Sequence, residues 1–121
     1  MAKHNELGKK GEELACNLLQ ETGYFILEKG WRSGQKEIDI IAKHGKLICI
    51  VEVKTRETDY HGSPVDAVNI SKQKKLIDAA EKYLEQNNLN NELRFDVISI
   101  ISPYNNPIVE HIEDAFHGLA E

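Results

Sequence analysis

The sequence predicts an α/β protein, more closely an α+β protein with a mixed sheet, whose elements follow the order α-β-β-β-α-β-β with the helices packed on the central sheet. Three observations predict this class. Two segments carry apolar residues at helical spacing. Five short runs rich in branched and aromatic residues lie between turn-forming residues. The length of 121 residues, with 40% hydrophobic and 29% charged residues, suits a single domain over residues 1–121.

The chain is expected to begin with a helix and a strand. A helix is predicted over residues 5–21, because leucines and alanines recur there at spacings of three, four and seven. Gly23 is expected to end this helix. A strand then follows at residues 24–27, and a turn is expected at residues 30–35.

Two apolar runs in the middle of the chain predict a β-hairpin. They cover residues 36–43 and 46–54, and His44-Gly45 between them is typical of a tight turn. A polar loop is expected over residues 55–64.

The last third of the chain predicts a second helix and two more strands. Ser71 is the expected N-cap of a helix over residues 72–86. One face of this helix is apolar and carries Leu76, Ile77, Ala80, Tyr83 and Leu84. Strands are predicted at 94–101 and 108–112, and one helical turn after Glu113.

Composition argues against several classes of protein. The longest apolar runs, at residues 47–51 and 97–101, are far shorter than the roughly 20 residues that cross a membrane. Residues 1–6 are polar, which is not typical of a secretory signal. Cys16 and Cys49 form no disulfide framework and are expected to be small buried hydrophobic residues. The expected location is the reducing cytoplasm.

The net charge of −5 is unevenly distributed. Residues 1–75 carry 13 Lys and Arg against 11 Asp and Glu, whereas residues 76–121 carry 2 against 9. A local basic face in the first part of the chain is therefore compatible with phosphate binding, because association follows the local field. A merely solvated acidic surface is an equal alternative.

The predicted hairpin contains the candidate chemistry. Side chains alternate between faces of a strand, so Glu52 and Lys54 share a face. A short turn at Gly45 places Asp39 opposite Ile50 or Glu52, and either register brings the Asp39 and Glu52 carboxylates within reach of one ion. Oxygen ligands on a rigid sheet suit Mg²⁺ or Mn²⁺. Lys54 beside such a cation suits metal-assisted phosphodiester hydrolysis.

Two other interpretations compete with a metal site, namely a solvated strand face and a buried ion pair. Acid-x-Lys triplets are common on exposed strand faces, but residues 47–51 are wholly apolar and indicate a strand buried on both faces. Buried charges need a partner or a metal ion. The remaining alternative is therefore a buried ion pair in which Lys54 binds Asp39 or Glu52.

Motifs along nearly the whole chain resemble the YraN family of small bacterial proteins. They occur in the order and at the spacing of that family: Gly11-Glu12-Glu13-Leu14-Ala15, Glu37-Ile38-Asp39-Ile40-Ile41-Ala42, Val51-Glu52-Val53-Lys54-Thr55-Arg56, Gly62-Ser63-Pro64-Val65-Asp66-Ala67-Val68, Lys72 and Arg94-Phe95-Asp96-Val97. The family in turn resembles the PD-(D/E)xK nuclease superfamily, especially its Holliday-junction-resolvase-like branch. The resemblance implies a restriction-endonuclease-like fold and a nuclease-like domain.

The same resemblance implies a role for particular residues. Asp39, Glu52, Val53 and Glu12 are the predicted metal ligands, with Lys54 as the catalytic lysine and the three acids also assigned to catalysis. Without the resemblance, Glu12 is better explained as an acid favoured near a helix N-terminus.

Four further residues are predicted to contact nucleic acid: Arg56, Thr55, Lys72 and Gln73. The planar guanidinium of Arg56 suits a phosphate, although a surface salt bridge is an equal alternative. Lys72 and Gln73 open the second helix, where basic residues favour anions but are often simply solvated. Trp31 is expected in the core rather than stacked on a base.

These observations lead to three hypotheses of function. The first is an Mg²⁺- or Mn²⁺-dependent endonuclease acting on DNA, with branched or damaged DNA as the candidate substrates. The second is a non-catalytic nucleic-acid-binding module on the same fold, and the third is a protein-interaction adaptor. A homodimer is expected only by analogy with junction-cleaving nucleases.

Overall fold

The structure, a computed structural model, describes residues 2–58 and 68–117, with side chains from residue 6 onward. It contains a five-stranded mixed sheet in the order β1-β2-β3-β4-β5. The strands are β1 (Phe25–Ser33), β2 (Lys36–His44), β3 (Leu47–Arg56), β4 (Leu93–Ile101) and β5 (Ile108–Phe116). Neighbouring strands are antiparallel except β3 and β4, which are parallel. The predicted element order is confirmed and is consistent with a restriction-endonuclease-like fold.

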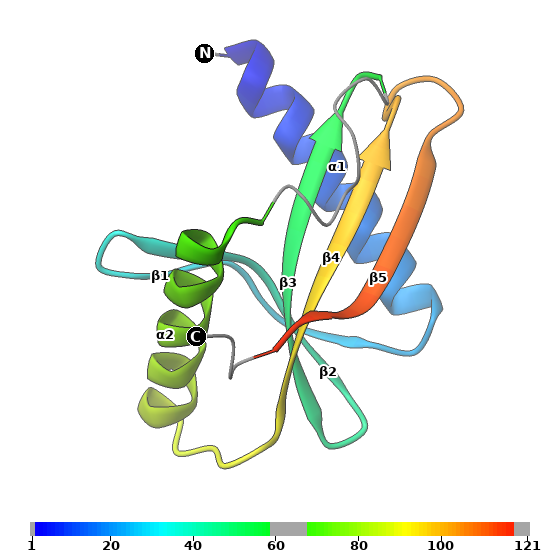
Figure 1. Ribbon diagram of the computed structural model, residues 1–121. Coiled ribbons are helices and arrows are strands. Elements are labelled where there is room, and N and C mark those ends of the chain that lie inside the picture. The colour runs from blue at the N-terminus through cyan, green and yellow to red at the C-terminus, as the bar shows by residue number, and fades with distance from the viewer. Residues whose placement is uncertain (1, 59–67, 118–121) are drawn as a thin grey trace.

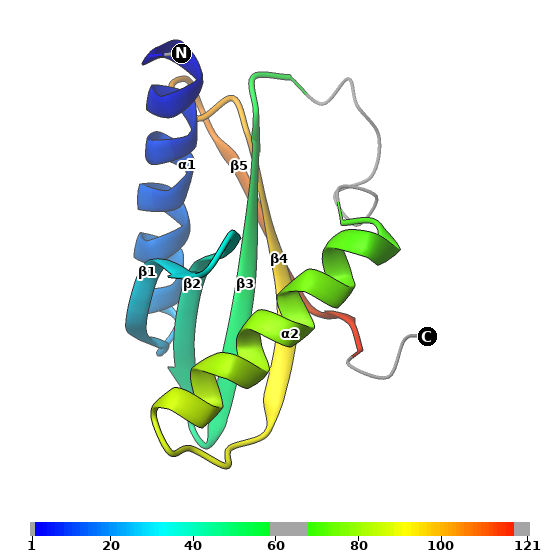
Figure 2. The same ribbon diagram turned by 90° about the vertical axis from the view of Figure 1, so that its left-hand side faces the viewer.

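The two helices cover opposite faces of this sheet (Figures 1 and 2). α1 (Ala2–Glu21) crosses one face, and α2 (Ile70–Gln86) connects the parallel strands β3 and β4 across the other. The core is accordingly double, with one apolar cluster under each helix. Alternate residues of β3 belong to different clusters, so Ile50 packs under α2 and Val51 under α1. The prediction that this strand is buried on both faces is confirmed.

Several element boundaries differ from the prediction. β1 continues to Ser33 instead of ending at residue 27, so the turn shrinks to Gly34-Gln35. Gly30 lies within the strand with a φ of 62°. Because glycine tolerates this conformation, the strand can bend there without ending.

The second half also corrects two predictions. Asn69, not Ser71, is the N-cap of α2, and its side chain accepts a hydrogen bond of 2.8 Å from the backbone N–H of Lys72. The helical turn predicted after Glu113 is wrong for the described residues, because β5 continues to Phe116. Pairing with β4 stabilises this extension, and Phe116 stacks on Phe95 with ring centroids 5.1 Å apart. The predicted loop overlaps residues 59–67, which lie outside the described residues.

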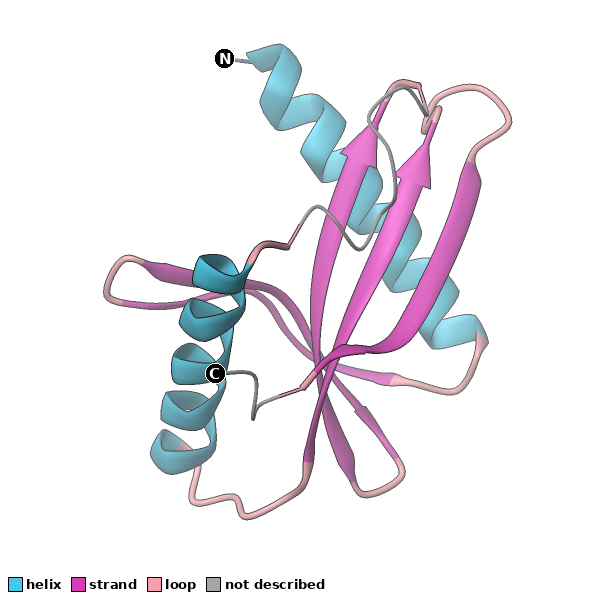
Figure 3. Cartoon of the chain, viewed as in Figure 1, coloured by secondary structure: helices cyan, strands magenta, loops and turns pink. Residues whose placement is uncertain are grey.

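The sheet divides at the centre of the molecule. Pairing between β2 and β3 ends at Ile40 and Val51. Beyond this point β3 continues beside β4 as far as Arg56, whereas the first half of β2 stays with β1. Figure 3 shows the turn between β1 and β2 pointing away from the C-terminal ends of β3 and β4. We call this divergence of β2 from β3 the fork.

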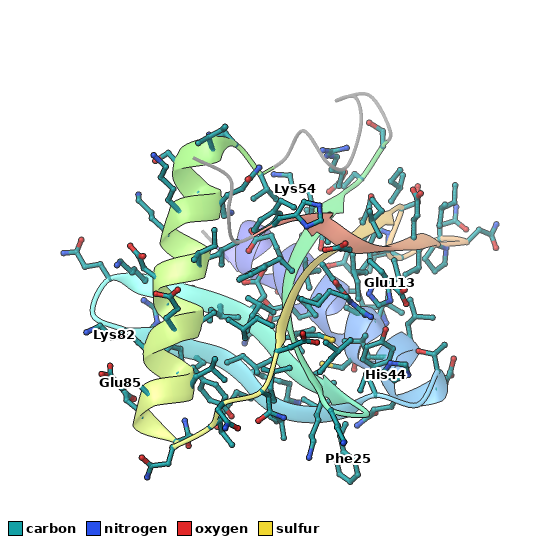
Figure 4. All side chains as sticks on the ribbon, turned by 60° about the horizontal axis from the view of Figure 1, so that its bottom comes forward. Phe25, His44, Lys54, Lys82, Glu85 and Glu113 are labelled. Carbon is teal, nitrogen blue, oxygen red and sulfur yellow. The ribbon has the colours of Figure 1, made fainter. Side chains whose placement is uncertain are left out.

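A buried ionic cluster lies elsewhere on the sheet, on the α1 face. The Asp96 side chain is completely buried and accepts hydrogen bonds from Arg94, from the backbone N–H of Asp114 and from His111. The phenol of Tyr24 accepts from Arg94 and donates to Glu113. Figure 4 shows Glu113 on the side of the molecule away from α2. Asp96 therefore has an ion-pair partner in Arg94, and these contacts of its carboxylate lie within the fold.

Two further observations concern the cysteines and the helices. Cys16 and Cys49 are free and buried, as predicted. In the part of the chain that the structure describes, no helix is long and apolar enough to cross a membrane.

Candidate functional site

Asp39 and Glu52 lie together in the fork. The pairing of Ile40 with Val51 makes Glu52 the cross-strand neighbour of Asp39, which selects one of the two registers left open by the sequence. One oxygen of Asp39, Oδ2, accepts a hydrogen bond of 2.8 Å from the backbone N–H of Val53. Because β2 has diverged from β3 here, no β2 carbonyl is available to the Val53 N–H, and the Asp39 side chain accepts its hydrogen bond instead.

The two carboxylates repel one another. Burial, followed by the negative charge of Glu52, raises the pKa of Asp39 from its ordinary value of 3.8 to about 7, although the Val53 N–H and Lys72 act in the opposite direction. A carboxyl group with such a pKa lacks sufficient positive charge nearby. The ionised form of Asp39 is therefore unfavourable in the fork.

Glu52 nevertheless has one cationic partner. Its carboxylate, only 9% exposed, forms an ion pair with the ammonium group of Lys72 at the start of α2. Among the ion pairs of the described residues, none joins Lys54 to either acid. The alternative expected Lys54 of β3 to pair with one of the acids, and this pairing is not found in the described part of the chain. Glu52 does form a buried ion pair, but its partner is Lys72 of α2.

A third acid reaches the fork from α1. Glu12 is half-buried, and its pKa is raised by burial and then by the charges of Glu37 and Glu52. α1 can approach β3 because Gly11 lies against Thr55, where an added Cβ would overlap with Oγ1 of that threonine. This close approach brings Glu12 into the same pocket as the two strand acids.

Two pockets meet at these acids. The first, of about 290 Å³, lies between the start of α1 and the end of β3 and is lined by Leu7, Gly8, Glu12, Asp39, Glu52, Val53, Lys54, Thr55 and Lys72. The second, of about 410 Å³, lies between the β1–β2 turn and the start of α2. Asp39, Glu52 and Lys72 line both pockets. A polymeric substrate that passes over the acids could therefore occupy space on either side of them.

The donor groups of the fork fit a hard divalent cation. Within the described ranges, no cluster of three or more His, Cys, Asp and Glu side chains could form a metal site from the protein alone. Magnesium does not require such a cluster, because it usually binds one or two carboxylates and keeps water or phosphate as its other ligands. The N–H and C=O of a strand residue point to the same neighbouring strand. The bond from Val53 to Asp39 thus directs the Val53 carbonyl into the fork as well.

Comparisons with known proteins identify the family. The model of the "Uncharacterised protein family UPF0102" matches residues 11–100. The chain belongs to this family. A UPF0102 protein of Christiangramia forsetii is 47% identical over 116 residues, which cover 96% of this chain and 98% of the relative. A UPF0102 protein of Flavobacterium psychrophilum is 45% identical over 117 residues, or 97% and 98% of the two chains. A third, of Phocaeicola vulgatus, is 39% identical over 97% of each chain. The resemblance to the YraN family is confirmed.

The other predicted residues of this UPF0102 chain are distributed unevenly around the fork. Lys54 is exposed and, like Thr55, lines the first pocket. Arg56 is only 7% exposed and lines neither pocket of the fork. The side-chain amide of Gln73 donates to the carbonyl of Val68, at 3.0 Å, and so contacts its own helix start. Trp31 packs edge-on against Tyr83 in the core, as expected.

Two features of the site were not predicted from the sequence. The pairing of Lys72 with Glu52 joins residues from different elements, and no local spacing indicates it. The close approach of Gly11 to Thr55 also depends on tertiary packing. A glycine in the middle of a helical pattern was its only signal, because glycine there costs about 1 kcal/mol relative to alanine and so indicates a packing requirement.

Proposed function

We propose that this UPF0102 protein is an Mg²⁺- or Mn²⁺-dependent endonuclease that hydrolyses phosphodiester bonds in DNA, with Asp39 and Glu52 holding the cation. The observation that carries the proposal is the unsatisfied charge of the fork, where burial and then the negative charge of Glu52 raise the pKa of Asp39 to about 7. Structural acids are ordinarily neutralised by internal partners, as Asp96 is. A strongly perturbed acid in an open pocket is instead a candidate for function.

Each residue of the fork has a part in this chemistry. Asp39, Glu52 and the Val53 carbonyl would hold the ion, and Glu12 supports the site from α1. A divalent cation at this position supplies Lewis-acid polarisation of the phosphate and lowers the pKa of water. The water oxygen forms a bond to phosphorus, the P–O ester bond breaks, and the leaving oxygen takes a proton. Lys54, which lines the same pocket, orients the water or stabilises the developing negative charge.

The surroundings of the second pocket support a phosphate-bearing substrate. Its lining combines three lysines with three acids and several polar groups: Lys36, Lys72 and Lys75, Glu37, Asp39 and Glu52, and Gln35, Asn69 and Ser71. Of the acidic residues in the last third of the chain, Asp78 pairs with Lys36 at this pocket, whereas Glu113 lies beside Tyr24. Lys72 and Lys75 at the start of α2 are the positive charges that would attract a DNA phosphate despite the net charge of −5.

The test is cleavage of labelled four-way junction, flap, single-stranded and linear duplex DNA in Mg²⁺, Mn²⁺ or EDTA. We expect wild-type protein to cut at least one of these substrates, and expect both EDTA and Glu52→Ala to abolish cutting. Glu85→Gln is the matched control, because Glu85 points outward from α2 (Figure 4). Cleavage that persists at the wild-type rate in both Asp39→Ala and Glu52→Ala would identify a contaminating nuclease and refute the assignment.

A second candidate is a nucleic-acid-binding module without catalysis. One observation favours it, namely that Lys72 already provides a cation for Glu52. Binding of the same DNA substrates that weakens with salt, without cleavage in any divalent metal, would support this alternative over the nuclease.

A further inference from the structure

The ion pair between Lys72 and Glu52 joins a buried acid to a side chain that reaches the solvent. The Glu52 side chain is 9% exposed, whereas that of Lys72 is 48% exposed. Both residues line the two pockets that meet at the fork. The ammonium group therefore occupies the carboxylate that the proposed metal ion requires.

A divalent ion and an ammonium group compete for such a carboxylate. Each binds the oxygen lone pairs directly, and two cations drawn to one buried acid repel each other strongly at short distance. The main chain of Lys72 is held in place, because its N–H donates to the side chain of the N-cap Asn69 at 2.8 Å. Its flexible four-carbon stem is free to reorient around this fixed point. Exchange of the ammonium group thus requires no rearrangement of α2.

A second site for the displaced ammonium group lies within reach of Lys72. Lys72 also lines the pocket between α2 and the β1–β2 turn, where the other basic residues are Lys75 and Lys36, the latter paired with Asp78, and where the acids Glu37 and Asp39 lie as well. Once separated from Glu52, the ammonium group would add a positive charge to this pocket. A phosphate of the DNA backbone is the partner that this combination of lysines and polar groups recognises.

We propose that Lys72 is an exchangeable counterion that couples metal binding to DNA binding. In the metal-free protein it neutralises Glu52; when a divalent ion binds, it leaves the carboxylate and contacts a backbone phosphate. This inference rests on the proposed metal site and assigns Lys72 two successive partners. It requires each ligand to favour the other, because coupling between two binding sites is reciprocal.

The first test measures Mn²⁺ binding without DNA, by the loss of the electron paramagnetic resonance signal of free Mn²⁺ during titration. Lys72→Met removes the competing charge and is expected to tighten Mn²⁺ binding on the order of tenfold. Lys72→Arg keeps the charge and should bind Mn²⁺ much as wild type does. Lys74→Met is the matched control, because Lys74 is an exposed residue of the same helix that lines neither pocket of the fork.

The second test measures DNA affinity, by fluorescence anisotropy of a labelled four-way junction with and without Ca²⁺ as the divalent ion. Wild-type protein is expected to bind the junction more tightly with Ca²⁺, and Lys72→Met to lose most of that gain. A third measurement needs no variant and so does not depend on mutant folding. Acylation of Lys72 by an amine reagent, followed by mass spectrometry, should accelerate when Mg²⁺ is added, whereas acylation of Lys74 should not.

The possible outcomes separate this inference from the proposed function. If wild type binds Mn²⁺ and Glu52→Gln does not, but Lys72→Met binds no more tightly and acylation of Lys72 ignores Mg²⁺, the metal site stands and the exchange is refuted. If wild type binds Mn²⁺, Lys72→Met binds it more tightly and Mg²⁺ accelerates acylation of Lys72, the exchange is supported; if Lys72→Met alone binds Mn²⁺, Lys72 blocks the site and the exchange is refuted. If no variant binds Mn²⁺ and the acylation rates stay constant, both the metal site and the exchange are overturned.

Discussion

Replacing Asp39 by asparagine should stabilise the metal-free protein while it removes a ligand of the proposed metal. The carboxylate is buried next to Glu52, and its ionised form is unfavourable in the fold. Asparagine has nearly the same shape and keeps an oxygen that can accept the hydrogen bond from the Val53 N–H. The substitution therefore removes the unfavourable charge and preserves the one hydrogen bond that positions the side chain.

The magnitude follows from the pKa. The pKa of Asp39 is about 7 in the folded chain and 3.8 in the unfolded chain, a difference of about 3. A pKa difference of one corresponds to about 1.36 kcal/mol. The upper limit is thus about 4 kcal/mol at pH 8. This limit already includes the attraction of Lys72 for the ionised carboxylate, and part of it is offset because the asparagine amide must itself be desolvated in the fork. We expect the free energy of unfolding to rise by about 1–3 kcal/mol, or roughly 3–5 °C in Tm for each kcal/mol.

The gain should depend on pH in a defined direction. A carboxyl group whose pKa is raised by folding binds more protons in the folded chain, so wild-type stability falls as pH rises from about 4 to about 7. Below this window both states are protonated and the unfavourable charge is absent. The advantage of Asp39→Asn should therefore be largest above pH 7 and nearly vanish at pH 4.

Urea unfolding of metal-free protein at pH 4, 6 and 8 tests this prediction. Glu85→Gln, at an exposed position on α2, controls for the loss of a carboxylate as such and should leave the free energy of unfolding nearly unchanged. Saturating Mg²⁺ should make wild type more stable than Asp39→Asn at pH 8. Only wild type binds the ion, and it gains about 2.7 kcal/mol at a ligand concentration of 100 times Kd. Equal or lower stability of Asp39→Asn in metal-free buffer at pH 8 would refute the account of the fork as an unsatisfied acidic site.

Two further predictions concern the packing around the site and the ionic cluster. Gly11→Ala should lower the free energy of unfolding by about 1–3 kcal/mol, because its Cβ overlaps with Thr55; Gly8→Ala, with nothing within 4 Å, should be neutral or stabilising. Urea titrations of both variants check this, and equal stabilities would contradict the close approach. Asp96→Asn should cost about 3–5 kcal/mol. Burial alone would raise the pKa of Asp96, but hydrogen bonds from His111 and Arg94 hold it below 3.8. Its contribution is therefore complete above that pH and is lost as pH falls through the lowered value, which acid titration of wild type and variant would test.

The sequence was sufficient to predict the elements, because their signals are local. Apolar periodicity located both helices, and alternation with a short turn located the hairpin that carries Asp39 and Glu52. The boundaries that failed depended on tertiary contacts. β5 extends to Phe116 because β4 pairs with it and Phe95 stacks on the ring. The N-cap is an exception, because Asn69 and Ser71 are both suitable caps on local grounds and only the structure shows that Asn69 is used.

The site was predictable in its acids but not in its cations. The spacing of Asp39 and Glu52 around one turn determines that they meet, since the register of a hairpin follows from its turn. The partner of Glu52 comes from a helix 20 residues further along the chain, so only the folded arrangement distinguishes Lys72 from Lys54. The position of Gln73 is similar, because its amide turns to the carbonyl of Val68 instead of the pocket.

The contrast between Asp39 and Asp96 shows why the fork is a better candidate for function than the more deeply buried cluster. Both residues lie in apolar strands, and the sequence around them is similar in character. Asp96 has a guanidinium, an imidazole and a backbone N–H as partners, so the protein lowers its pKa in spite of complete burial. Asp39 has one backbone N–H and a neighbouring acid, so burial and then the charge of Glu52 raise its pKa. The fold neutralises Asp96 with internal partners. It leaves Asp39 beside a second carboxylate at the opening of a pocket, and a bound cation would relieve this unfavourable charge.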